Sequence, residues 1–167
     1  YIARAQNSCG TKFDTVNITI LSLPTLTRSN DTTICSGQSA KIKAKSNYTH
    51  TWTTLSLTDT LVTVTPTLTT KYPIFVTSVC GIKRDTVTVN VINNPTIVAR
   101  TDTSICAGDS ILLTATANTT ITWLPMNIVS NSIKVSPSTT SSYIARAQNS
   151  CGTKFDTVLI NVIMKIV

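Results

Sequence analysis

The chain has 167 residues, of which only 13% are charged, with 14 Lys and Arg, 7 Asp and a single His. Glu is absent, and Thr, Ser and Asn fill most polar positions, so residues that favour helices are scarce. No GxSxG, HExxH, CxxC or glycine-rich phosphate-binding motif is present. These features exclude the common catalytic and metal-binding patterns, and we expect no enzyme activity, no cofactor and no metal site. No apolar run is long enough for a transmembrane helix, so we expect no membrane insertion in this segment.

The formal net charge of +7 raises the question of a nucleic acid partner. The basic residues are spread along the whole chain, and no stripe of Arg and aromatic residues accompanies them. One row stands out, Lys41, Lys43 and Lys45, at the spacing of one strand face. The equivalent positions further along the chain are Leu112, Thr114 and Thr116. The row is therefore interpreted as a solvated strand face, and no nucleic acid partner is expected.

The chain repeats itself with a constant period. Residues 143–158 (YIARAQNSCGTKFDTV) are identical to residues 1–16, and a weaker copy occupies residues 72–87, so the period is 71. This period predicts three parts: 1–22, the last hairpin of a truncated repeat; 23–93, a complete repeat; and 94–167, a complete repeat with the start of the next linker. A chain that begins inside a repeat is expected to be an internal piece of a longer protein.

Each repeat reads as a series of short strands. Apolar and β-branched residues alternate with polar ones, and Gly, Pro, Asn and Asp separate these runs at intervals of about 8 to 12 residues. This pattern predicts an all-β sandwich rather than a parallel sheet. In the third repeat we expect one strand over 95–106, loose chain over 125–131 and a connection over 148–156. The other strands are expected at 111–117, 120–124, 132–136, 143–147 and 157–162.

The order of these strands, with Trp52 and Trp123 in the third and Tyr1, Tyr72 and Tyr143 before the N-x-C-G turn, resembles immunoglobulin-like domains. In particular it resembles the tandem Ig-like or PKD-like repeats of Bacteroidetes cell-surface proteins, such as gliding-type or filamentous adhesins. The resemblance covers the whole chain. It implies tandem immunoglobulin-like β-sandwiches with Trp52, Trp123, Tyr72 and Tyr143 in their cores.

The five cysteines depart from the antibody pattern. At the positions of the usual core disulfide the third repeat has Ala115 and Ala145. The resemblance places Cys35 and Cys106 at one pole of a sandwich and Cys9, Cys80 and Cys151 at the other, roughly 20 Å apart. That is too far for a disulfide within one repeat.

Stacking of repeats would instead bring Cys35 to Cys151 across a repeat boundary, which is the preferred pairing. Cys9, Cys80 and Cys106 would then have partners outside the sequence. Pairing of Cys35 with Cys80 and of Cys106 with Cys151 remains an alternative, as do free thiols.

Every Asp is followed by Ser or Thr. Six of these triplets are similar to the O-glycosylation signal of Bacteroidetes secreted proteins, and the resemblance implies these acceptors: Thr15, Thr32, Thr60, Thr86, Ser110 and Thr157. The alternative is that Asp followed by a β-branched residue marks a turn entering a strand.

These features together predict a structural stalk or filament segment of an extracellular bacterial surface adhesin, located at the cell surface. Its expected partners are neighbouring repeats of the same chain, covalently attached glycans and, by lateral association, other chains in a fibre. The alternatives are a carbohydrate- or protein-binding Ig-like module, or a spacer domain of a secreted enzyme.

Overall fold

The structure, a computed structural model, describes residues 1–164, and all regular secondary structure in this range is β-strand. The strands are β1 (Ile2–Asn7), β2 (Gly10–Thr15), β3 (Leu26–Arg28), β4 (Thr32–Cys35), β5 (Ala40–Ser46), β6 (His50–Trp52), β7 (Leu61–Val64), β8 (Thr70–Ser78), β9 (Gly81–Ile92), β10 (Ile97–Ala99), β11 (Thr103–Cys106), β12 (Ile111–Ala117), β13 (Ile121–Leu124), β14 (Ile128–Val129), β15 (Ser132–Val135), β16 (Ser141–Asn149) and β17 (Gly152–Ile163).

The described chain forms two compact units. The first contains residues 1–31, 41–64 and 71–88, and the second contains residues 32–40, 65–70 and 89–164. The division passes through the second sequence repeat. The repeat boundaries at residues 22 and 93 follow from the sequence period and stay a prediction.

The third repeat, in the second unit, is a sandwich of two sheets with strand orders β10-β12-β15 and β11-β17-β16-β13-β14. Alternate residues of the strands point inward, so Leu113 and Ala115 of one sheet pack with Trp123, Ala145 and Val158 of the other in a single buried cluster. Trp123 is fully buried, and its indole Nε1–H donates to the Ser130 carbonyl over 3.1 Å. This Trp lies in the core as expected, whereas Tyr143 is only partly buried against the cluster.

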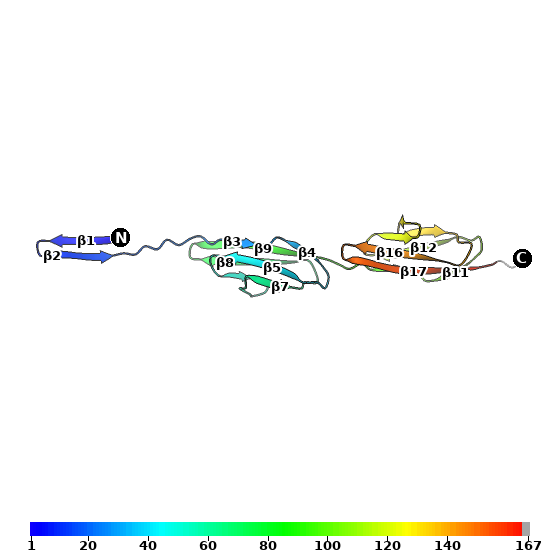
Figure 1. The fold of residues 1–167 in the computed structure, drawn as a ribbon, viewed down its shortest axis with the longest axis horizontal. Helices are drawn as coiled ribbons and strands as arrows, with labels where there is room; N and C mark the ends of the chain where they lie inside the picture. Colours follow the sequence, from blue (N-terminus) through cyan, green and yellow to red (C-terminus); the bar gives the residue numbers. More distant parts are fainter. Residues whose placement is uncertain (165–167) are drawn as a thin grey trace. The chain divides into compact units, whose positions relative to one another are not determined.

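The prediction of one strand over 95–106 is wrong, because the structure has two strands there, β10 and β11, which belong to different sheets. β10 pairs antiparallel with β12, whereas β11 pairs parallel with β17, beside which it lies in Figure 1. Asp102 lies between them, and its Oδ1 accepts a hydrogen bond from the Leu159 backbone N–H of β17 over 2.9 Å. The Asp therefore anchors the crossing segment to the second sheet.

The connection expected over 148–156 is also wrong. β16 and β17 pair without interruption from Ser141↔Ile160 to Asn149↔Gly152, so only Ser150 and Cys151 form the turn. Opposite residues such as Arg146 and Phe155 continue the ladder through a stretch whose Asn, Gly and Asp suggest a loop. The loose stretch expected over 125–131 likewise contains the short strand β14.

The second repeat has the same pattern one period earlier in the sequence, with strand orders β3-β5-β7 and β4-β9-β8-β6. Its buried residues in the first unit include Ile42, Trp52, Tyr72 and Val87. His50 is buried as well, with its Nε2 3.2 Å from the Asp59 carbonyl oxygen, which also accepts from Trp52 Nε1. Trp52 and Tyr72 therefore lie in the core as expected.

The β1–β2 hairpin has the same residues and the same register as β16–β17, with Ile2 opposite Thr15 just as Ile144 is opposite Thr157. The two copies differ in burial. Ala145 and Ala147 are fully buried, whereas the identical Ala3 and Ala5 are exposed. The hairpin register is thus determined by local sequence, and burial depends on the strands packed around it.

Candidate functional site: the Cys35–Cys151 joint

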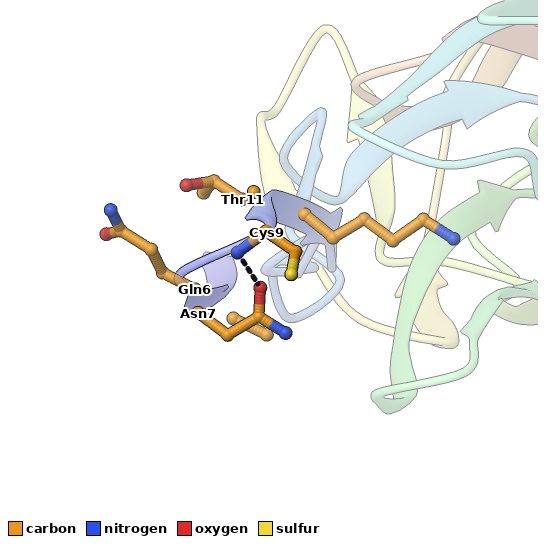
Figure 2. A pocket seen from close by; sticks show the side chains of 7 residues that line it. Gln6, Asn7, Cys9 and Thr11 are labelled. Carbon is orange, nitrogen blue, oxygen red and sulfur yellow. Dashed lines mark hydrogen bonds between the residues drawn. The ribbon is translucent and has the colours of Figure 1, made fainter.

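The turn between β16 and β17 presents Cys151 in a defined geometry. The Asn149 Oδ1 accepts a hydrogen bond from the Cys151 backbone N–H over 2.8 Å. Gly152 follows with φ of 146°, a backbone conformation that residues other than Gly rarely adopt. Figure 2 shows the same arrangement in the first copy, where Asn7 Oδ1 points at the backbone nitrogen of Cys9. In that copy the turn borders a shallow hollow of about 390 Å³. The N-x-C-G sequence therefore encodes a rigid turn that carries a thiol at its tip.

Cys35 is held at the end of β4. The next residue, Ser36, donates its backbone N–H to the Ile92 carbonyl over 2.9 Å, and the Gln38 N–H donates to the Cys35 carbonyl over 2.9 Å. These bonds fix the chain after β4 against the last residue of β9. Cys35 thus lies beside the linker that leads into the third repeat.

The β16–β17 turn binds the same linker. Cys151 Sγ lies 3.7 Å from the Ile92 carbonyl oxygen, and Asn149 Nδ2 donates to the Asn93 carbonyl over 2.8 Å. Asn118 Nδ2 donates to the next carbonyl, that of Asn94, over 3.0 Å. Three successive linker carbonyls are thus contacted by the third repeat, which ties the linker to that repeat.

These contacts bring the two half-buried cysteines together. Cys35 and Cys151 form a disulfide with a Cα–Cα distance of 5.5 Å and a sequence separation of 116 residues. This is the pairing that we preferred on the basis of the sequence, and it links a residue of the second repeat to one of the third. The alternative of Cys35 with Cys80 and Cys106 with Cys151 is excluded, because Cys80 and Cys106 are free. The reason is geometric. Cys106 lies opposite Ile163 at the end of β17, whereas Cys151 directly precedes Gly152 at its start, so the length of β17, about 37 Å, separates the two cysteines.

No family model matches this chain, and no curated protein matches it. Solved structures do match. Sidekick-1 immunoglobulin domains 1–4 align with a TM-score of 0.63 at 13% identity, covering 96% of this chain and 57% of that one. Titin domains I67–I69, an E-to-A variant, align at 0.59 and 10%, covering 87% and 67%. The N-terminal four Ig domains of Dscam1 isoform 9.44 align at 0.57 and 13%, covering 92% and 50%.

The fold is immunoglobulin-like. At these identities the similarity concerns the fold alone, and the chain spans only about half of the Dscam1 and Sidekick-1 structures. In an Ig-like sandwich the strands run from one pole to the other. Cysteines at opposite poles of one repeat are therefore too far apart for a disulfide, whereas cysteines at the facing poles of two successive repeats can pair.

Cys9, Cys80 and Cys106 are all free and exposed. Two of them repeat the local geometry of the joint. Cys80 Sγ lies 3.7 Å from the Leu21 carbonyl oxygen, one sequence period before the contact of Cys151 with Ile92. After Cys106, the Ala107 N–H donates to Ile163 as Ser36 does to Ile92. Cys80 therefore has the local contacts of Cys151, and Cys106 has those of Cys35, so each is positioned as one half of a disulfide of the Cys35–Cys151 kind.

The six candidate glycosylation residues differ in exposure. Thr15, Thr60, Ser110 and Thr157 are exposed, whereas Thr32 and Thr86 are half-buried. In three of the Asp-Thr pairs the Asp carboxylate accepts the backbone N–H of the Thr: Asp14, Asp85 and Asp156. These three pairs lie inside strands, so the interpretation as turns entering a strand is wrong for them.

Structural roles for three of the aspartates are not evident from the sequence alone. Asp156 accepts the Ala99 N–H and Asp102 the Leu159 N–H, while Asp31 accepts the Thr88 N–H. Each bond links the first segment of a sandwich to its last strand. The recurrence of Asp at the sequence period, as in Asp31 and Asp102, was the available signal.

Arg28 adds an ion pair to this set in the second repeat. Its Nε lies 2.9 Å from Asp85 Oδ1 and its Nη1 3.0 Å from Asp31 Oδ1. The hydrogen bond from Arg28, together with the Thr86 N–H, lowers the pKa of Asp85, and the bond to Asp85 raises the pKa of Arg28. Ala99 occupies the equivalent position in the third repeat, so the ion pair is specific to the second.

Replacing Asp85 by Asn should lower the stability at pH 7 by about 0.5–1 kcal/mol, since the side chains are partly exposed and screened. Because the pKa of Asp85 is lowered by folding, its contribution is present above the unfolded value of about 3.9 and is lost as the pH falls through the folded value. Urea unfolding of D85N and the unaltered chain should therefore differ at pH 7 and converge in acid. Asp14→Asn is the control, and a constant difference down to low pH would contradict the ion-pair origin.

Among residues 1–164 no group of three or more His, Cys, Asp or Glu side chains is placed to hold a metal ion. The same residues include no helix long and apolar enough to cross a membrane.

Proposed function

We propose that this chain is a segment of an extracellular stalk or filament of a bacterial surface adhesin, of the kind found in Bacteroidetes. The observation that carries the proposal is the Cys35–Cys151 disulfide, which covalently links two Ig-like repeats and limits how far they can separate. Disulfides persist in oxidising environments such as the cell exterior. A chain built from repeats that are joined in this way provides length and resists extension, and the proposal assigns it no catalytic activity.

The linker contacts support the same role. The hydrogen bonds to the Asn93 and Asn94 carbonyls restrict the few residues between the second and third repeats. Pro95 follows and is buried, so this part of the chain has little conformational freedom. Asn47 restricts the linker that precedes the second repeat: its Nδ2 donates to the Leu23 carbonyl, as Asn118 does to Asn94, and also to the Ser22 hydroxyl. In the proposed array each repeat holds the linker that leads into it.

The free cysteines extend the proposal. Cys80 and Cys106 are presented as halves of the joint, and we assign their partners, with that of Cys9, to neighbouring repeats of the same longer chain. Exposed Thr15, Thr60, Ser110 and Thr157 are the proposed glycan acceptors, and lateral association of chains into fibres remains part of the proposal.

The test is peptide mapping by mass spectrometry, without reduction, on protein taken from the native cell surface. We expect a cross-link between Cys35 and Cys151, cross-links from Cys80 and Cys106 to peptides of other repeats, and added hexose mass at Asp-Thr peptides. Recovery of all five cysteines as reduced thiols would overturn the extracellular, covalently joined stalk. Cross-links without added mass would remove the glycans and leave the stalk.

A further inference from the structure

Strand β5 exposes a row of three lysines. Lys41, Lys43 and Lys45 are exposed, and they alternate with the buried Ala40, Ile42 and Ala44. Because successive side chains of a strand point to opposite faces, the three ammonium groups project from one face of the β3-β5-β7 sheet at intervals of about 6.8 Å. The result is a regular line of positive charge.

Two shallow hollows lie along this row. The first, of about 320 Å³, is lined by Lys43, Lys45, Thr27 and Thr60 among others. The second, of about 410 Å³, shares Thr27 and Lys45 with the first and adds Thr25. Thr27 lies directly opposite Lys45 in the β3–β5 ladder, so the hollows adjoin. Hydroxyl groups thus accompany the ammonium groups along the sheet face.

No ion pair among residues 1–164 neutralises the charge of the row. Within residues 1–164 the ion pairs are those of Arg28 with Asp31 and Asp85, so the guanidinium at the edge of the first hollow is compensated and the lysines are not. No aromatic side chain lines either hollow, and single-stranded nucleic acid binding depends on such side chains for stacking. The face therefore favours an anionic partner without bases.

The fold does not require these lysines. The third repeat forms the same sheet with Leu112, Thr114 and Thr116 at the equivalent positions. The row is thus a specific property of the second repeat, which otherwise shares the framework of the third.

We propose that the β5 face of the second repeat binds a linear acidic polysaccharide, with Lys41, Lys43 and Lys45 contacting successive carboxylate or sulfate groups. Lys ammonium groups act as point charges that suit a mobile polyanion, whereas bidentate recognition would call for Arg. Thr25 and Thr60 line the hollows and carry hydroxyls that can bond sugar hydroxyls, whereas the Thr27 hydroxyl donates to the Lys45 carbonyl over 3.4 Å and can serve the sugar as an acceptor. This goes beyond the stalk role, because it gives the side of the stalk a ligand of its own.

The experiment measures binding of the oxidised chain to alginate, to dextran sulfate and to neutral dextran by calorimetry at low salt. The variant K43T/K45T introduces the residues of the third repeat, and the control K134T/K154T removes the same charge from exposed positions of the third repeat. We expect binding to at least one acidic polymer and none to dextran. K43T/K45T should bind about tenfold more weakly or worse, since two charge contacts are lost, and the control within about twofold of the unaltered chain. Added salt should weaken binding throughout.

Three results would overturn the proposal. They are no binding of the unaltered chain to either acidic polymer, equal weakening in the two variants, or binding of oligo-dT as tight as that of the polysaccharides. The reciprocal variant T114K/T116K is expected to strengthen binding, which separates the effect of the row from any loss of folding.

Discussion

Stretching residues 23–164 between their ends is expected to release about 400 Å less polypeptide with the Cys35–Cys151 disulfide intact than in the C35S/C151S variant, because the bond closes a loop with a sequence separation of 116 residues. An extended chain spans at most about 3.3–3.6 Å per residue. Strands β5 to β16 all lie inside this loop and are withheld from extension. Single-molecule force spectroscopy measures the released length directly.

The control for this experiment is the variant C80S/C106S, which removes the free thiols of residues 23–164 and keeps the disulfide. It should release as little chain as the unaltered protein, and adding a reductant should restore the full length in both. Equal release from the oxidised protein and from C35S/C151S would show that the bond does not form, and the stalk would then lack its covalent limit.

Amide hydrogen exchange should differ between the two identical hairpins by a factor of about a thousand or more. Residues 2–15 and 144–157 have the same sequence and the same register, so their intrinsic exchange rates are equal. The second copy packs in the sandwich, and its Ala145 and Val158 are fully buried. The first copy is exposed throughout, and an isolated two-stranded hairpin is at best marginally stable.

This comparison needs NMR detection, because peptides of equal sequence have equal mass. The signals of the two copies separate by their environments. The third repeat supplies its own reference, because a core variant such as Ile160→Ala should raise exchange in that sandwich, including residues 144–157, and leave residues 2–15 unchanged. Equal protection of both copies would contradict the expectation and show that residues 1–16 bury their inner face against another partner in solution.

The repeat and the core could be predicted from sequence because they depend on local pattern. Inward positions such as Leu113, Trp123 and Trp52 follow from alternation, and the return of Trp at the same place in each complete repeat restricts the alignment of the strands. The Cys35–Cys151 pairing followed from placing cysteines at the poles of a known topology. Immunoglobulin-like architecture was thus accessible without any contact information.

The features that were missed depend on contacts between distant residues. The change of sheet at Asp102 is not visible in a run of β-branched residues, because it depends on the Leu159 N–H on another strand. The long β16–β17 ladder runs through Asn149, Gly152 and Asp156, residues that are depleted in strands, and it persists because each has a partner opposite. Local propensity was overridden there by pairing.

The identity of the two hairpins has a consequence for biosynthesis. Residues 1–16 leave the ribosome before residues 143–158, and they carry every side chain that β16 and the first half of β17 contribute to the third sandwich from Tyr143 onward. Because the two copies are identical, β10 to β15 offer both copies the same pairing and packing partners, so exchanged assembly would compete with ordered assembly in any molecule whose residues 1–16 have no sandwich of their own. Cys9 would then occupy the place of Cys151. A Cys9–Cys35 cross-link in the peptide map would record each molecule that made the exchange, and the Cys35–Cys151 bond, once closed, excludes it.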